Sequence, residues 1–152
     1  MAELLKSGVG ATFSIVAGEP ATYDDTGFAA LTFAEVGEVI SIGAYGGTAE
    51  VLTQTPVKSG IIKKVKGSTN YGSQTLQFGL ETDTGQAALQ SGFDGANKDA
   101  IHSVKLEYSD GSVRYYTGLV TSFEFQEISA SSFVNAASTI EVNNSVVDVV
   151  PA

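Results

Sequence analysis

The sequence predicts a mainly β protein, a β-sandwich or barrel of two packed antiparallel sheets with one flanking short α-helix and a long inter-strand loop. Residues 102–108 and 113–126 alternate apolar and polar side chains with the period of half-buried strands, and an Asp-Gly turn separates them. The chain has 17 glycines and no tryptophan, which is typical of a β-rich fold with many turns. Only residues 83–92 combine helix start and stop signals.

The first third of the chain contains two predicted strands and an arm. Residues 1–10 form a predicted N-terminal arm, because an apolar pair is followed by closely spaced glycines. Residues 12–16 alternate and are predicted as a strand, and the YDDTGF stretch at 23–28 has the composition of a turn. A second strand is expected over 36–42, where Gly37 indicates a bulge.

Residues 48–73 are predicted to form a long basic loop, because small and polar side chains dominate them. Four of the eight basic residues lie here within nine positions: Lys58, Lys63, Lys64 and Lys66. One interpretation is a solvated loop whose lysines discourage edge-to-edge aggregation. The other is a basic arm that docks on an acidic surface of a partner. Charge alone does not decide between them.

The only predicted helix spans residues 83–92. Asp83 has the position of an N-cap, Gln86 follows three residues later, and Gly92 is the expected stop. Residues 71–80 precede it as a predicted strand.

The hairpin over residues 102–126 organises the rest of the chain. Its return strand is expected to run for about 13 residues, or about 43 Å, roughly twice the usual strand length. We therefore expect part of it to project or to pair with another chain. A further strand is predicted over 133–142, and 143–152 form a C-terminal arm or edge strand. The expected core residues are Leu76, Phe78, Leu106, Tyr108, Leu119, Phe123 and Ile140.

Composition restricts the function classes. At 152 residues the chain is expected to form a single domain, 1–152, and its net charge of −9 argues against a protein that grips nucleic acid or an anionic membrane. We expect no catalytic, cofactor-binding or metal-ligating residues, since there is no cysteine, His102 is the only histidine, and no catalytic motif occurs. No apolar run approaches the ~20 residues of a membrane span and no signal peptide is evident, so we expect synthesis and folding in a cytoplasm.

An ordered set of short motifs resembles the tail tube (major tail) proteins of long-tailed bacteriophages, of the lambda type. The motifs are YDDTGF at 23–28, VGEV at 36–39, GG at 46–47, TPVK at 55–58, KGS at 66–68, YGSQTL at 71–76, GQAAL at 85–89 and DGSVRYYTGLV at 110–120. Each is mostly turn chemistry, so the specificity lies in their order over about residues 12–142.

The resemblance implies a structural virion protein without enzymatic activity. Such proteins close into hexameric rings that stack into a hollow tail tube, which holds a tape-measure protein and then delivers DNA to the host. The implied partners are further copies of the chain, the tape-measure protein and tail-end proteins. The implied location is the virion tail, after assembly in the host cytoplasm. The segment 48–73 resembles the family's long loop, which reaches the adjacent ring.

A tube lumen must not bind DNA tightly, so it is expected to be acidic rather than basic. We take Glu38, Glu50, Glu107 and Glu124 as the acids that face it. The alternative to a tail tube protein is a β-sandwich binding module, such as a capsid-decorating or receptor-binding domain. A monomer with an aromatic binding patch would favour that alternative, and a hollow filament would favour the tube.

Overall fold

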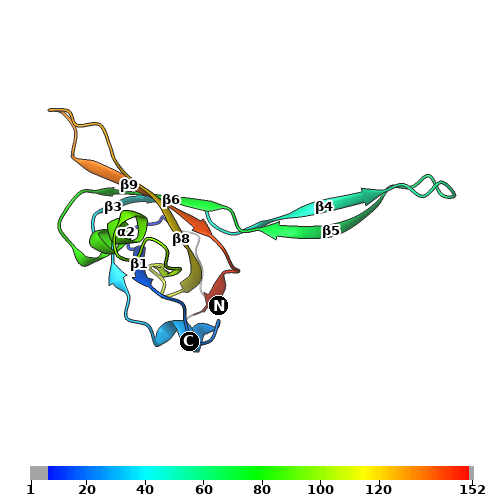
Figure 1. The fold of residues 1–152 in the computed structure, drawn as a ribbon, viewed down its shortest axis with the longest axis horizontal. Coiled ribbons are helices and arrows are strands. Elements are labelled where there is room, and N and C mark those ends of the chain that lie inside the picture. Colours follow the sequence, from blue (N-terminus) through cyan, green and yellow to red (C-terminus); the bar gives the residue numbers. More distant parts are fainter. Residues whose placement is uncertain (1–6, 151–152) are drawn as a thin grey trace.

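A computed structural model describes residues 7–150 of the chain (Figure 1). The expected arms at 1–10 and 143–152 therefore lie partly outside the described residues, at 1–6 and 151–152. The elements are β1 (Thr12–Ala17), α1 (Asp25–Ala29), β2 (Ala34–Glu35), β3 (Val39–Ile42), β4 (Thr48–Gln54), β5 (Lys63–Asn70), β6 (Ser73–Gly79), α2 (Thr84–Asp94), β7 (His102–Glu107), β8 (Val113–Phe125), β9 (Asn135–Val142) and β10 (Val147–Val149). The mainly β class with a flanking short helix is confirmed.

One antiparallel sheet of eight strands forms the body, in the order β2-β1-β7-β8-β9-β6-β3, and β10 pairs with the start of β8. The sheet curls around the core, and α2 covers one side of it (Figure 1). The second sheet, β4–β5, projects away from the body instead of packing across the core. The core is therefore enclosed by one curled sheet and a helix, where we had expected two sheets face to face.

The long strand β8 makes this curl, because it pairs with different strands along its length. Its first half pairs with β7, and its second half pairs with β9 from Gly118 to Phe125. The register of the β8–β9 pair shifts between Val120 and Ser122. The expectation that part of the strand projects is therefore wrong, since β8 is paired with β7 or β9 from Val113 to Phe125.

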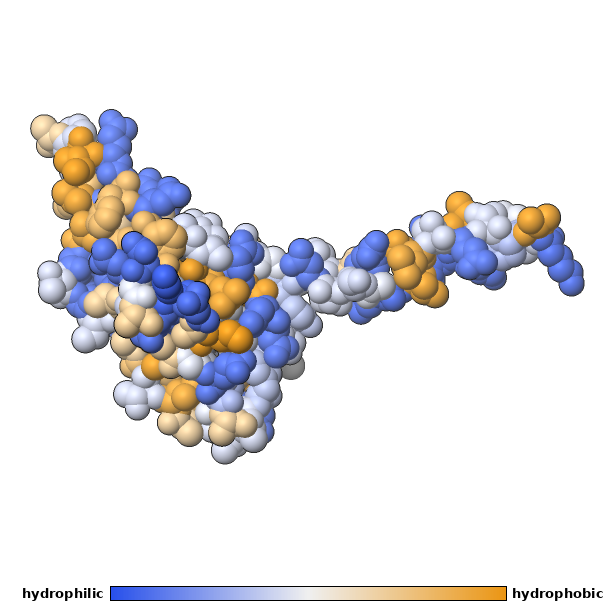
Figure 2. All heavy atoms as spheres, in the orientation of Figure 1, coloured by the Kyte–Doolittle hydropathy of each residue, from blue (hydrophilic) through white to orange (hydrophobic). Residues whose placement is uncertain are grey.

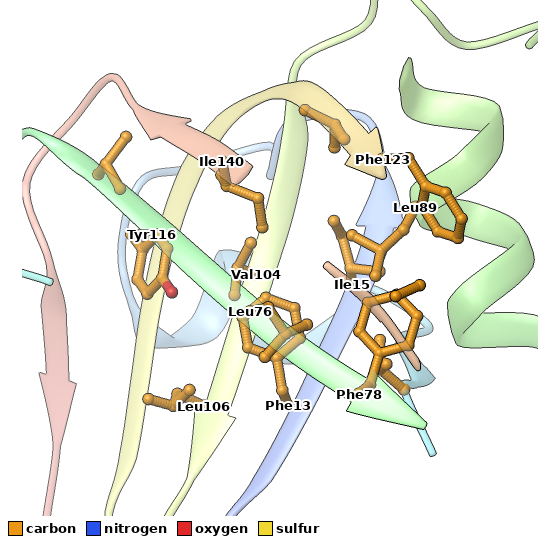
Figure 3. Packing of buried hydrophobic residues seen from close by; sticks show 14 residues of the cluster. Phe13, Ile15, Leu76, Phe78, Leu89, Val104, Leu106, Tyr116, Phe123 and Ile140 are labelled. Carbon is orange, nitrogen blue, oxygen red and sulfur yellow. The ribbon is translucent and has the colours of Figure 1, made fainter. Parts of the chain in front are cut away.

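The core consists of aliphatic and aromatic side chains from β1, β6, β7, β8, β9 and α2 (Figure 3). Five of the seven predicted core residues are buried, namely Leu76, Phe78, Leu106, Phe123 and Ile140. Tyr108 is partly buried against the cluster, and Leu119 is 39% exposed. The prediction for Leu119 was wrong because strict alternation assumed an unbroken strand. Before the register shift Tyr116 and Val120 face the core, and after it Phe123 does.

Helix α2 approaches the sheet closely through glycines. Asp83 is the N-cap, as predicted, and its Oδ1 accepts a hydrogen bond from the Gln86 backbone N–H at 2.7 Å. The helix does not stop at Gly92 but continues to Asp94, with Gly95 as the C-cap. Gly92 serves packing instead, since a Cβ there would lie 2.8 Å from Nε2 of His102.

Two predicted turns also differ from expectation. The 23–28 stretch contains the single-turn helix α1, because Oδ1 of Asp24 accepts a hydrogen bond from the Gly27 backbone N–H at 2.8 Å and so caps it. The β7–β8 connection is longer than the expected two-residue turn, since residues 108–112 link the strands and three of them lie between Tyr108 and Ser112. Tyr108 N–H donates to the Ser112 carbonyl at 2.9 Å, and Gly111 adopts the left-handed φ of 93° that this longer turn requires.

Candidate assembly surfaces

The segment 48–73 is a projecting β-hairpin and not a loop. We call residues 48–70 the arm; it consists of β4, β5 and the connecting tip at 55–62. The strands pair from Thr48 with Asn70 to Gln54 with Lys63, with one irregularity between Ala49 and Val51. The prediction of a loop was based on the small and polar side chains of the segment. These side chains are present because the hairpin does not face the core. Cross-strand pairing nevertheless satisfies the backbone, which 23 structureless residues could not do.

Almost every side chain of the arm is exposed, including its large apolar ones. Leu52 lies opposite Val65 on one face of the ribbon, and both are exposed. At the tip Val57, Ile61 and Ile62 are exposed as well, with Ile62 at 59%. Figure 2 shows apolar patches along the arm and at its end. A two-stranded ribbon of this kind is only marginally stable in water. Because its apolar side chains are exposed, they are available for contact with another molecule.

The four predicted lysines all lie in the arm. Lys64 and Lys66 pair with Thr53 and Val51 and share one face with them, whereas Lys63 lies on the other face and Lys58 in the tip. Within residues 7–150 the ion pairs are Lys105–Glu107 and Arg114–Asp148, so none of the arm lysines has an acidic partner there. The arm carries +3 from its four lysines and one glutamate, and the rest of the chain carries −12 within the total of −9.

A groove of about 380 Å³ lies at the opposite end of the body from the arm. It is lined by Glu38, Ile40, Gly79, Leu80, Glu81, Phe133, Val134 and Asn135, and we call it the body groove. Its apolar side chains are exposed, with Phe133 at 87% and Val134 at 46%. Phe133 and Val134 come from the β8–β9 connection, which extends at the upper left in Figures 1 and 2.

Carboxylates cluster at one rim of the body groove. Hydrogen bonding between the carboxyl groups of Glu81 and Asp83 raises the pKa of Glu81, and the charge of Glu38 acts in the same direction. Oδ2 of Asp83 also accepts a hydrogen bond from the Gly37 backbone N–H at 2.9 Å. Mutual repulsion among these acids means that a cation placed beside them would be stabilised.

Gln86 holds the backbone around this rim. Its buried side chain donates to the carbonyls of Gly79 at 2.8 Å and Gly37 at 3.1 Å, and it accepts from the backbone N–H of Glu81 at 2.9 Å. The predicted capping-box partner thus does not return to its own N-cap but links α2 to β6 and to the segment between β2 and β3.

The four acids predicted to face a lumen are not brought together. Glu38 and Glu124 lie toward one end of the curled sheet. The Glu38 carbonyl accepts a hydrogen bond from the Gly79 backbone N–H, Gly79 pairs with Asn135, and Glu124 pairs with Ala137 two residues further along β9. Glu107 lies at the other end, where β7 meets β8, and Glu50 lies on the arm.

His102 is a titratable side chain in the core that could be considered for a chemical role. His102 is fully buried, its Nδ1 lies 3.0 Å from the Ala100 carbonyl, and burial lowers its pKa. Among residues 7–150, no group of three or more His, Cys, Asp or Glu side chains is arranged to hold a metal ion. None of the helices in the same range has the length and apolar content needed to cross a membrane.

Solved structures share the fold described above. No protein-family model and no curated protein matches the sequence. A chain of the anti-feeding prophage baseplate is similar with a TM-score of 0.67 and 12% identity, covering 98% of this chain and 97% of that one. A chain of the virion of a native gene transfer agent gives 0.65 and 12%, covering 95% and 99%. The SPP1 tail tube gives 0.61 and 10%, covering 91% and 75%.

The chain has a tail tube fold. The similarity confirms the resemblance at the level of the fold, without distinguishing a lambda type from other types.

Sequence reasoning located the lysines of the arm but missed the body groove. Leu80 is the last residue of the predicted strand 71–80, whereas β6 ends at Gly79 and leaves Leu80 at the rim of the groove. Ile40 does lie in a strand, β3, but its side chain is exposed, and Phe133 precedes β9 instead of opening the predicted strand 133–142. The sequence feature that could have indicated the groove is the acidic pair Glu81 and Asp83 directly after an apolar strand. This pair borders a groove only because the β8–β9 connection folds back beside it.

Proposed function

We propose that this chain is the structural subunit of a phage-type tail tube, with no enzymatic activity. Copies close into hexameric rings, and rings stack into a hollow tube through which DNA is delivered to the host. The observation that supports this most strongly is the arm, because its apolar and basic side chains are exposed and belong to no buried core within residues 7–150. The body from which it projects has a tail tube fold.

Ring closure would use the open edges of the curled sheet. The outer side of β3 has no strand partner among residues 7–150, and a cavity of about 510 Å³ separates it from residues 8–11. A strand of a neighbouring copy could continue the sheet at such an edge, and repetition of the same rotation would close a ring. The anti-feeding prophage baseplate, to which this chain is similar, was solved with sixfold symmetry.

The arm would act between rings. In this proposal Lys58, Lys63, Lys64 and Lys66 lie against an acidic surface of a copy in the adjacent ring, since the rest of the chain carries the opposite charge. Exposed ion pairs contribute only about 0–1 kcal/mol each and are screened by salt, so six arms per ring would have to act together.

The lumen would be acidic and would not hold DNA, because each basic contact with phosphate adds affinity. We retain Glu50, Glu107 and Glu124 as acids that face it, whereas Glu38 borders the body groove. The tape-measure protein and tail-end proteins are the further partners, and the virion tail of a long-tailed phage of the lambda type is the proposed location, after assembly in the host cytoplasm.

Negative-stain electron microscopy of the purified protein tests the proposal. Hollow filaments are the expected result, and a monodisperse monomer at up to millimolar concentration would favour a binding module instead. In the same assay the variant carrying Lys63→Glu, Lys64→Glu and Lys66→Glu should give rings or monomers that stack poorly, with an unchanged circular dichroism spectrum. Normal tubes from this variant would show that the lysines are merely solvated.

A further inference from the structure

The arm and the body groove are complementary surfaces at opposite ends of one chain. The arm projects to the right in Figure 1, whereas the β8–β9 connection and the end of β6, which line the groove, lie at the left. One chain therefore cannot satisfy both surfaces by itself. A contact between two different surfaces of identical chains is heterologous, and it generates rings or filaments instead of closed dimers.

We propose that the body groove receives the arm tip of a second copy of this chain. This inference rests on the proposed tube, and it names the surface on which the arm docks. In this contact Ile61 and Ile62 lie against Ile40, Leu80 and Val134, and the lysines beside them lie against Glu38 and Glu81.

Apolar complementarity provides the affinity in this contact. The tip presents Val57, Ile61 and Ile62, and the groove presents Ile40, Leu80, Phe133 and Val134, all of them exposed in the single chain. Contact between these two sets removes apolar surface from water on both sides. Phe133 at the mouth of the groove is an aromatic side chain of the kind that anchors protein interfaces.

Charge complementarity sets the direction of docking. The tip and β5 carry Lys58, Lys63, Lys64 and Lys66 and no acid, while the groove is lined by Glu38 and Glu81 and by no base, and Asp83 lies beside Glu81. Hydrogen bonding with Asp83 is the main cause of the raised pKa of Glu81, the charges of Asp83 and Glu38 add to it, and a lysine at this rim would offset those charges. A second arm could not replace the groove as partner, because like charges would meet.

A hydrogen-bond acceptor in the groove also lacks a donor. Oδ1 of Asn135 is buried and has no hydrogen-bond partner among residues 7–150, although Asn135 lines the groove. Buried acceptors are seldom left unpaired, and a lysine ammonium or a backbone N–H of the incoming tip supplies the donor.

Disulfide trapping tests the contact directly, because the chain has no cysteine of its own. One preparation carries Ile62→Cys and a second carries Val134→Cys, and the two are mixed under mild oxidation. The control replaces Val134→Cys with Val9→Cys, a position beside the other cavity that is more exposed, at 81% against 46%, so accessibility alone would favour the control pair. We expect the Ile62–Val134 pair to form a mixed dimer at least tenfold faster than the control pair. Equal rates, or a faster control pair, would overturn the proposal.

Charge exchange provides a second, independent test. The variant Glu38→Lys with Glu81→Lys should lower self-association at least tenfold in sedimentation experiments, and Lys63→Glu with Lys64→Glu in the same chain should restore part of it. The control Glu19→Lys with Asp99→Lys makes the same change in net charge at two exposed positions away from the groove. A combined variant that associates no better than the groove variant would contradict the proposal.

Failure of this inference is distinguishable from failure of the proposed function. Hollow tubes of normal length from the groove variant would exclude the groove as the docking surface and leave the tube intact. If the unmodified chain forms no tubes but the Ile62–Val134 pair still crosslinks, the groove contact stands and the tube does not.

Discussion

The body and the arm are built from the same kind of secondary structure but differ in what stabilises them. In the body, strands of the curled sheet bury Phe13, Leu76 and Tyr116 completely, and α2 adds Leu89. In the arm, β4 and β5 pair equally well, yet Leu52 and Val65 remain exposed. Pairing satisfies the backbone in both regions, but only the body removes a large apolar surface from water. The body therefore has a core that stabilises it, whereas the arm has none, and in our proposal contact with another copy would stabilise the arm.

This difference matters for the proposed function, because the exposed side chains of an arm that docks on another chain must stay without partners in its own chain. Ordering a marginal ribbon at the moment of contact costs conformational entropy and lowers the affinity of each arm. Many weak contacts then add up to a stable assembly. The predictions below separate the two regions, beginning with the largest expected effect.

Removing the arm should abolish assembly and leave the body folded. Thr48 and Asn70 are paired neighbours, so residues 49–69 can be replaced by the two-residue turn Asn-Gly without stretching the chain. We expect no tubes by electron microscopy and a urea midpoint close to that of the intact chain. A large loss of body stability would show that the arm contributes to the core after all.

Shortening the same kind of side chain in the two regions should have unequal effects. Leu106 is 2% exposed in the core, so Leu106→Ala should lower the free energy of unfolding by about 2–5 kcal/mol. Val65→Ala in the arm should change it by less than about 0.5 kcal/mol, because that side chain already faces water. Urea titrations at low protein concentration measure both. Equal losses would contradict the division into body and arm.

Local patterns determined much of the body but little of the candidate site. The strands 12–16 and 71–80, the hairpin from His102 and the N-cap Asp83 were readable from alternation and capping. The exposure of Leu119 was not, because the register shift after Val120 depends on pairing with β9. The groove was not readable either, since it exists only where the β8–β9 connection meets the end of β6. The sequence shows the periodicity of apolar side chains and the distribution of charge, but contacts between segments distant in the chain depend on tertiary structure.

Gln86 should contribute more to the stability of the fold than an ordinary polar side chain does, since it hydrogen-bonds with three backbone groups near the body groove. Gln86→Ala leaves the carbonyls of Gly37 and Gly79 and the N–H of Glu81 without this partner. We expect a loss of about 1–3 kcal/mol in the free energy of unfolding. Gln77→Ala, on the exposed face of β6, is the control and should have almost no effect. Similar values for the two variants would mean that water replaces Gln86 easily.

The smallest expected effect is a pH dependence from His102 in the body. Burial lowers its pKa below the ordinary value of 6.5, so the unfolded chain binds this proton more readily than the folded one. Stability is therefore fully present above about pH 6.5 and is lost progressively as the pH falls toward the folded pKa. The raised pKa of Glu81 acts in the opposite direction, because the folded chain binds that proton more readily than the unfolded one, so the comparison with a variant that lacks His102 isolates the histidine over about pH 7.5 to 5.5.

The measurement is the free energy of unfolding across that window for the intact chain and for His102→Gln, which has no proton to gain. We expect it to decline toward acid for the intact chain and to stay nearly flat for the variant, even if the variant is less stable throughout. The arm deletion should show the same decline as the intact chain, because His102 packs against Gly92 of α2 and not against the arm. A decline that persists in His102→Gln would assign the proton to another group. A decline that disappears with the arm would place that group in the arm or its docking surface, and the body would then not be the independent unit described above.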